Sequence, residues 1–171
     1  MTARAGPGAS ASTARRFGAQ SMTAPLLDVL VSPPAAAFGC AYEDPALGFL
    51  GPVDLAAARR EHDALCELLA GLGVTVHLLD VDGPSADLVY VYDALLVGDK
   101  GTIALRSGKP SRRGEEAILE GWTRDRGIPP AGRIAAPGCV DGGDTFWLRP
   151  GLFCIGRSLR TNEAGARQLA A

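Results

Sequence analysis

The stretch Ala86–Val97, ADLVYVYDALLV, decides how the rest of the chain is interpreted. It is apolar and uncharged apart from two carboxylates, Asp87 and Asp93. Side chains on a strand alternate between its faces, so two residues six positions apart project to the same side. We therefore predict a buried strand over this stretch, with both acids on one face.

Two acids on one face of an apolar strand cost free energy unless a cation meets them. A planar guanidinium fits best, because two carboxylates can share its fork of N–H donors, whereas an ammonium is a point charge. The stretch therefore predicts half of a binding site for a small cationic group. The alternative is that both acids lie at strand ends in solvent.

Composition restricts the class of protein. The 171 residues suggest one domain that can bury a sizeable core, and 47% of them are hydrophobic and 21% charged. The net charge of −2, the pI near 5.7 and the dispersed basic residues argue against a nucleic-acid partner. No apolar run reaches the roughly 18–20 residues that span a bilayer, so we expect no membrane partner.

The four cysteines, Cys40, Cys66, Cys139 and Cys154, lie far apart and show no metal-ligand spacing with each other or with histidine. This argues against a zinc site and against a secreted disulfide framework. It favours a reduced, cytoplasmic setting. We expect neither a metal nor a cofactor.

Residues 1–24 are rich in Ala, Ser, Thr and Arg, contain no Asp or Glu, and have no apolar periodicity. We expect them to form a disordered N-terminal extension. They could pass for an organellar transit peptide, and the simpler explanation is an upstream start codon with Met22 as the true beginning. Residues 25–171 would then make up the folded domain.

Periodicity and turn residues predict the element order β, α, β, β, β, α, β, β, β, α, a mixed α/β fold. The expected strands cover 26–32, 74–79, 86–97, 102–106, 133–136, 140–148 and 152–155, and the expected helices cover 54–70, 112–126 and the end of the chain from 163. Asp54, Ser111 and Asn162 are the expected N-caps. Arg112 would stand in the first turn of its helix, where the helix dipole disfavours a cation, and a broken local preference often marks function.

Four blocks of sequence, in this order, resemble the guanidino-group-modifying (pentein) superfamily: ADLVYVYDALLV, RSGKPSRRGE, VDGGDTFWL and GRSLRTNEAG. This group includes dimethylarginine dimethylaminohydrolase, arginine deiminase and the amidinotransferases. The resemblance covers residues 26–171 and implies a partial pentein-type α/β propeller of repeated ββαβ units, truncated to the N-terminal portion of a catalytic domain.

The resemblance also implies roles for single residues. Asp87 and Asp93 match the acids that hold the substrate guanidinium, and Arg112 and Arg160 match residues that pair with the substrate carboxylate. Tyr92 stands where dimethylarginine hydrolases usually carry a glutamate, and a phenol cannot neutralise a cation. The particular guanidine therefore stays open among dimethylarginine, arginine and agmatine-like amines.

The block DGGD carries the remaining implied residues. Asp141 looks like the carboxylate that orients a catalytic histidine, as in a triad. Gly142, Gly143 and Asp144 would form the supporting turn, although this tetrapeptide is also simply a good turn sequence.

The implied activity is hydrolysis of a C–N bond in a substituted guanidine, which gives a citrulline-like product and an amine. The cysteine nucleophile and the histidine acid of that chemistry would lie beyond this chain. The partner would be a small guanidino substrate, with a homodimer as one option for assembly. The alternative is a non-catalytic fragment or pseudoenzyme binding module of the same fold, because fold alone does not decide function.

Overall fold

The structure is a computed structural model that describes residues 17–81, 83 and 85–171. The N-terminal extension predicted to be disordered covers residues 1–24, and residues 1–16 of it lie outside the described residues. In the described N-terminal part, the backbone at Gly18 packs against the backbone of Gly98, on the turn of a hairpin.

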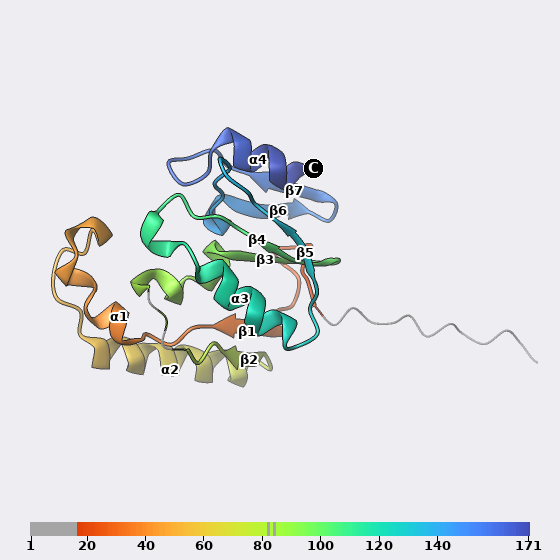
Figure 1. The fold of residues 1–171 in the computed structure, drawn as a ribbon. Helices are drawn as coiled ribbons and strands as arrows, with labels where there is room; N and C mark the ends of the chain where they lie inside the picture. Colours follow the sequence, from red (N-terminus) through yellow and green to blue (C-terminus); the bar gives the residue numbers. More distant parts are fainter. Residues whose placement is uncertain (1–16, 82, 84) are drawn as a thin grey trace, which may run out of the picture.

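The fold is mixed α/β, and the described strands form three separate sheets, none of them closed (Figure 1). The strands are β1 (Asp28–Val31), β2 (Thr75–Leu78), β3 (Leu95–Gly98), β4 (Gly101–Ala104), β5 (Pro130–Arg133), β6 (Thr145–Arg149) and β7 (Leu152–Ile155). The helices are α1 (Ala36–Gly39), α2 (Leu55–Gly71), α3 (Glu115–Arg124) and α4 (Glu163–Ala170). Apart from the four-residue α1, this order of strands and helices matches the predicted order.

Each sheet joins strands in a simple way. β1 and β2 are parallel, with α2 between them in the chain. β3 and β4 form an antiparallel hairpin that turns between Gly98 and Gly101, and β5 adds to β4 in parallel after α3. β6 and β7 form a second hairpin. The unit β3–β4–α3–β5 thus has the strand–strand–helix–strand order that the sequence predicts.

Two of the three predicted N-caps are confirmed. Asp54 accepts a hydrogen bond of 2.8 Å from the backbone N–H of Ala57, and Asn162 accepts one of 2.8 Å from Gly165. Asn162 also accepts the N–H of Cys139 at 3.0 Å, so this cap ties α4 to the loop before β6. Such side chains satisfy N–H groups that a helix leaves unpaired at its start.

The prediction of one strand over 86–97 is wrong. Two 3₁₀ turns, η3 (Ala86–Val89) and η4 (Val91–Asp93), precede β3. The Oγ of Ser85 accepts the N–H of Asp87 at 3.1 Å, and this local bond starts the first turn instead of a strand. Strand alternation therefore does not explain how the two acids are placed.

The prediction of a helix over 112–126 is also wrong at its start. Ser111 does not cap it; α3 begins at Glu115 after Gly114, whose φ of 105° favours glycine, and Arg112 lies in the preceding 3₁₀ turn η5 (Pro110–Arg112). Arg112 therefore does not oppose the dipole of α3, whose first turn holds glutamates.

Two strand boundaries also differ from the prediction. The strand expected at 133–136 lies earlier, at Pro130–Arg133. The strand expected at 140–148 begins only at Thr145, because a 3₁₀ turn, η6 (Gly142–Asp144), precedes it.

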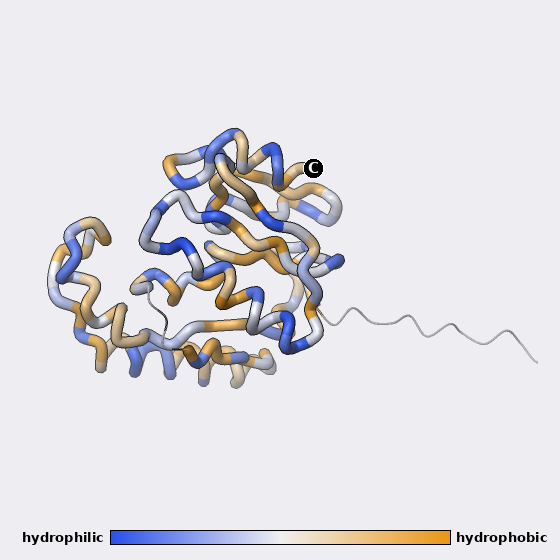
Figure 2. Tube along the Cα trace, in the orientation of Figure 1, coloured by the Kyte–Doolittle hydropathy of each residue, from blue (hydrophilic) through white to orange (hydrophobic). Residues whose placement is uncertain are grey.

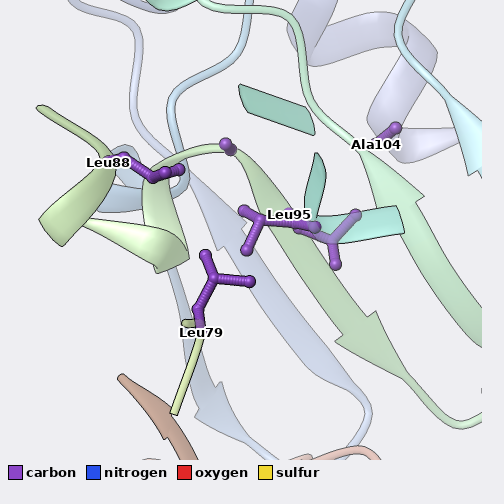
Figure 3. Packing of buried hydrophobic residues seen from close by; sticks show 6 residues of the cluster. Leu79, Leu88, Leu95 and Ala104 are labelled. Atoms are coloured by element: carbon purple, nitrogen blue, oxygen red, sulfur yellow. The ribbon is translucent and has the colours of Figure 1, made fainter. Parts of the chain in front are cut away.

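The core lies between α3, the three-stranded sheet β3–β4–β5 and the 3₁₀ turns η3 and η4. One buried cluster contains Leu79, Leu88, Ala94, Leu95, Ala104 and Leu119 (Figure 3). A second buried cluster contains Leu96, Leu105, Ile134 and Val140. Phe153 of β7 and Leu169 of α4 pack against it, so it joins the sheet β3–β4–β5 to the last hairpin and to α4. These clusters hold η3 and η4 against the sheet and so fix the backbone that carries Asp87 and Asp93.

The outer helix α2 lies beneath β1 and β2 and alternates between hydrophilic and hydrophobic residues along its length (Figure 2). Among the described residues, none of the helices combines the length and apolar character that crossing a membrane requires.

Candidate active site

The polar side chains of interest meet where the turns η3, η4, η5 and η6 come together. We call this set the acid–guanidinium cluster; it comprises Asp87, Asp93, Lys109, Arg112, Glu115, Asp141, Asp144 and Arg160. The members come from segments far apart in the chain, so the tertiary fold assembles the site.

Asp87 and Asp93 both approach one guanidinium, that of Arg112. The Nη1 of Arg112 donates to Asp93 Oδ2 at 2.7 Å, and its Nε lies 3.9 Å from Asp87 Oδ2. Lys109 pairs with the same Asp87 oxygen at 3.1 Å. The acids thus share a guanidinium, and in this structure it belongs to the protein itself.

Arg112 is deeply buried, with a side-chain exposure of only 4%. Its Nε and Nη2 donate to the carboxylate of Glu115 at 2.9 and 2.7 Å, and Nη2 also donates to the backbone carbonyls of Asp87 and Tyr90. Burial would lower the pKa of Arg112, but hydrogen bonds to Glu115 and Asp93 outweigh it and raise the pKa above its ordinary value. Arg112 therefore stays charged and ties η3, η4 and α3 together.

Asp141 faces Asp93 across the cluster. Its Oδ1 accepts the N–H of Gly143 at 2.9 Å, and its Oδ2 lies 3.4 Å from Arg160 Nη1. Burial raises the pKa of Asp141, and the nearby charge of Asp93 raises it further, more than Arg160 and the Gly143 N–H lower it. The two carboxylates are thus close enough to repel each other.

Gly142 makes this proximity possible. A Cβ at Gly142 would overlap the backbone carbonyl of Tyr92, so the backbones of η4 and η6 touch at this point. Gly143 lies between the acids, since a Cβ there would stand 3.0 Å from Asp141 Oδ1 and 3.3 Å from Asp93 Oδ1. Only glycine allows this contact between the two turns.

Asp144 holds the loop before α4. Its Oδ2 accepts hydrogen bonds of 2.6 Å from both Ser158 and Thr161. Burial opposes the charge of Asp144, but these hydrogen bonds and Arg160 together bring its pKa below the ordinary value. The loop presents Arg160, which remains 47% exposed and is the most accessible guanidinium of the cluster.

Tyr92 lies beside the cluster without an interaction with its acids. Its hydroxyl donates to the carbonyl oxygen of Thr145 at 3.3 Å, and the side chain is about half-exposed. Tyr92 thus links η4 to β6 and presents part of its ring to solvent.

Sequence reasoning missed Lys109 and Glu115. Glu115 follows Arg112 by three residues, a spacing at which opposite charges pair on a helical segment. That spacing could have identified the pair. Only the fold shows, however, that Glu115 is buried while its neighbour Glu116 is partly exposed.

No cysteine contacts an acid of the cluster within the described part of the chain. Cys139 Sγ accepts from Arg106 at 3.1 Å, and Cys66 lies 3.7 Å from His62 on α2. Burial, with the charge of Asp63, raises the pKa of the Cys66 thiol, so it is a poor nucleophile. The residues from 17 to 171, apart from 82 and 84, also contain no group of His, Cys, Asp and Glu suited to hold a metal ion.

Comparison with known proteins confirms the resemblance. The chain is 41% identical over 123 residues to a dimethylarginine dimethylaminohydrolase of Pseudomonas aeruginosa, which covers 71% of this chain and 48% of that enzyme. It is 34% identical over 119 residues to the enzyme of the same name from Streptomyces coelicolor, covering 70% of this chain and 45% of that one. No protein-family model matches the chain.

Solved structures agree. A variant of the Pseudomonas aeruginosa enzyme in complex with citrulline superposes with a TM-score of 0.72 at 35% identity, over 84% of this chain and 55% of that one. The N-terminal domain of a cyanobacterial arginine dihydrolase gives a TM-score of 0.72 at 18% identity, which shows a shared fold. The chain spans about half the length of the curated relatives it matches.

Proposed function

Because this chain is homologous over most of its length to the dimethylarginine dimethylaminohydrolases of the pentein superfamily, we propose that it binds an arginine-like guanidine. Asp87 and Asp93 receive the guanidinium group. The relatives that support this are guanidino hydrolases by name, and one neighbouring structure contains citrulline.

The observation that carries the proposal is the contact of both acids with one guanidinium. Asp93 makes a charge-assisted hydrogen bond of 2.7 Å to Arg112, and Asp87 lies 3.9 Å from the same group. Carboxylates placed in this way match the donor fork of a guanidinium better than a point charge. An incoming guanidinium would engage the same pair.

The other residues have supporting roles in this proposal. Arg160, which is about half-exposed, pairs with the carboxylate of an amino-acid substrate, and Arg112 is the second residue assigned to that carboxylate. Asp141 orients a histidine supplied by polypeptide outside these 171 residues. An imidazolium there would offset the repulsion from Asp93 that raises the pKa of Asp141.

The chemistry follows from this arrangement in a longer protein that also supplies a cysteine. The thiolate attacks the guanidinium carbon, and the C–N bond breaks as the histidine protonates the departing amine. Water then attacks the carbon of the thiouronium intermediate while the histidine, now neutral, accepts a proton from it, and the C–S bond breaks to release a citrulline-like product and the thiolate. Residues 25–171 of the present chain would form the N-terminal portion of that catalytic domain, an incomplete propeller of ββαβ units.

Calorimetric titration of the 171-residue chain with L-arginine and with dimethyl-L-arginine tests the binding proposal. Asp93→Asn should weaken binding about tenfold or more, because a hydrogen bond to a charged group is worth about 1.5–3 kcal/mol. Asp125→Asn, at the exposed end of α3, is the matched control and should change nothing. Equal binding by wild type and Asp93→Asn would refute the assignment.

A non-catalytic binding module is the second candidate, favoured by the separation of every described cysteine from the cluster. It predicts binding of the same guanidines with no turnover even when a longer protein is assayed. Release of citrulline by that longer protein would exclude it.

A further inference from the structure

Glu115 is among the most deeply buried charged residues of the cluster, with a side-chain exposure of 2%. Both of its carboxylate oxygens contact Arg112, and Nε and Nη2 of that guanidinium are the donors. Glu115 does not cap the helix, because it is the carboxylate of Glu116 that accepts the N–H of Gly114 at 2.8 Å. A buried carboxylate that helix capping does not require calls for another explanation.

The charge balance of the cluster supplies that explanation. Without Glu115, the two acids Asp87 and Asp93 would face two cations, Lys109 and Arg112, and this half of the cluster would carry no net charge to attract a cationic ligand. With Glu115, three carboxylates face two cations, which leaves one negative charge unbalanced. On the other side of the cluster, Asp141 and Asp144 share the single cation Arg160.

Geometry supports the same conclusion. Glu115 engages the Nε–Nη2 edge of Arg112, so only the Nη1 end reaches Asp93. A guanidinium without this partner could turn its two-donor edge toward Asp93 and occupy it more fully. Glu115 therefore limits how strongly Arg112 competes for the acids.

We propose that Glu115 is a positioning residue of the guanidine site, which balances and holds Arg112 so that Asp87 and Asp93 retain a net negative charge. This inference rests on the proposed function and deepens it. The ligand class it selects is a planar monocation, in preference to a neutral urea of the same shape.

The test compares two ligands that differ in head-group charge. L-Arginine carries a guanidinium and L-citrulline a neutral urea, so the ratio of their dissociation constants measures charge preference. Glu115→Gln should reduce this preference about tenfold or more, while Glu115→Asp, which keeps the charge, should retain it within about threefold. Glu120→Gln is the control, because Glu120 lies on the same helix and pairs with Arg133 outside the cluster.

A purely structural role predicts a different result. If Glu115 only stabilises the fold, Glu115→Gln weakens both ligands equally and the ratio stays constant, which overturns the inference while the proposed function stands. If the wild type binds neither ligand, the proposed function fails and this inference with it. Circular dichroism checks each variant for folding. If Glu115→Gln unfolds, the two titrations are repeated in trimethylamine N-oxide, an osmolyte that stabilises folded proteins, and the same ratio decides: a reduced preference supports the inference and an unchanged one overturns it.

Discussion

Replacement of Arg112 by methionine removes the only cation that contacts Glu115 among the described residues. Methionine retains an apolar stem of similar length, so the change mainly deletes the guanidinium. Glu115 is then a buried carboxylate without a cation, and Asp93 loses a hydrogen bond of 2.7 Å. The buried backbone carbonyl of Asp87 and the partly buried one of Tyr90 each lose a donor as well.

The expected cost is large for a single substitution. Breaking a buried ion pair by removing one partner costs about 3–5 kcal/mol, because the remaining charge stays desolvated. A domain of this size has a total stability of roughly 5–15 kcal/mol, so the variant loses a substantial part of it. At about 2–4 °C per kcal/mol, the melting temperature should fall by roughly 6–20 °C.

Urea unfolding at pH 7, followed by the fluorescence of Trp122 and Trp147, measures the decrease in the free energy of unfolding. Arg167→Met is the matched control, since Arg167 forms an exposed ion pair with Glu163 on α4 and should contribute less than about 1 kcal/mol. The double variant Arg112→Met, Glu115→Met should lose clearly less stability than the two single variants lose when their losses are added. Neither charge is left unpaired in the double variant. A loss below about 1 kcal/mol for Arg112→Met, or additive losses, would refute this account.

Three further outcomes are expected. Gly142→Ala should cost about 1–3 kcal/mol and weaken guanidine binding, because the added methyl overlaps the Tyr92 carbonyl and separates the two turns; wild-type stability in urea would contradict this. The lowered pKa of Asp144 stabilises the fold above the ordinary pKa of an aspartate, and this contribution disappears as the pH falls through the lowered value. Asp144→Asn should therefore be less stable at pH 7 and should show a shallower decline in urea midpoint between about pH 5 and pH 2 than wild type. The 171-residue chain should release no citrulline from L-arginine or dimethyl-L-arginine in a colorimetric assay, and turnover would show that a cysteine of this chain is the nucleophile.

Local residues explain the elements that the sequence predicts well. Asp54 and Asn162 start their helices through their own side chains, and the turns at 98–101 and 150–151 place the hairpins. Each of these features depends on residues within a few positions of one another. Such features can be inferred without knowing how distant segments pack.

The stretch 86–97 shows where this inference stops. Its residues Ala86, Leu88 and Leu95 are buried in the 3₁₀ turns and β3, as they would be in one continuous strand, so hydrophobicity alone does not distinguish the two. The hydrogen bond from the Asp87 N–H to Ser85 and the packing of Leu88 and Leu95 into one cluster decide for turns. The two acids still meet one guanidinium, but by tertiary contact and not by strand alternation.

Residues close together in the chain are enough to predict the order of the strands and longer helices, and they identify Asp87 and Asp93 as acids within an apolar stretch. The packing of distant segments places Arg112 between those acids and buries Glu115 against it. Burial and charge pairing depend on distances between turns far apart in the chain. Those distances are set by packing of the whole core, which no local pattern of residues encodes.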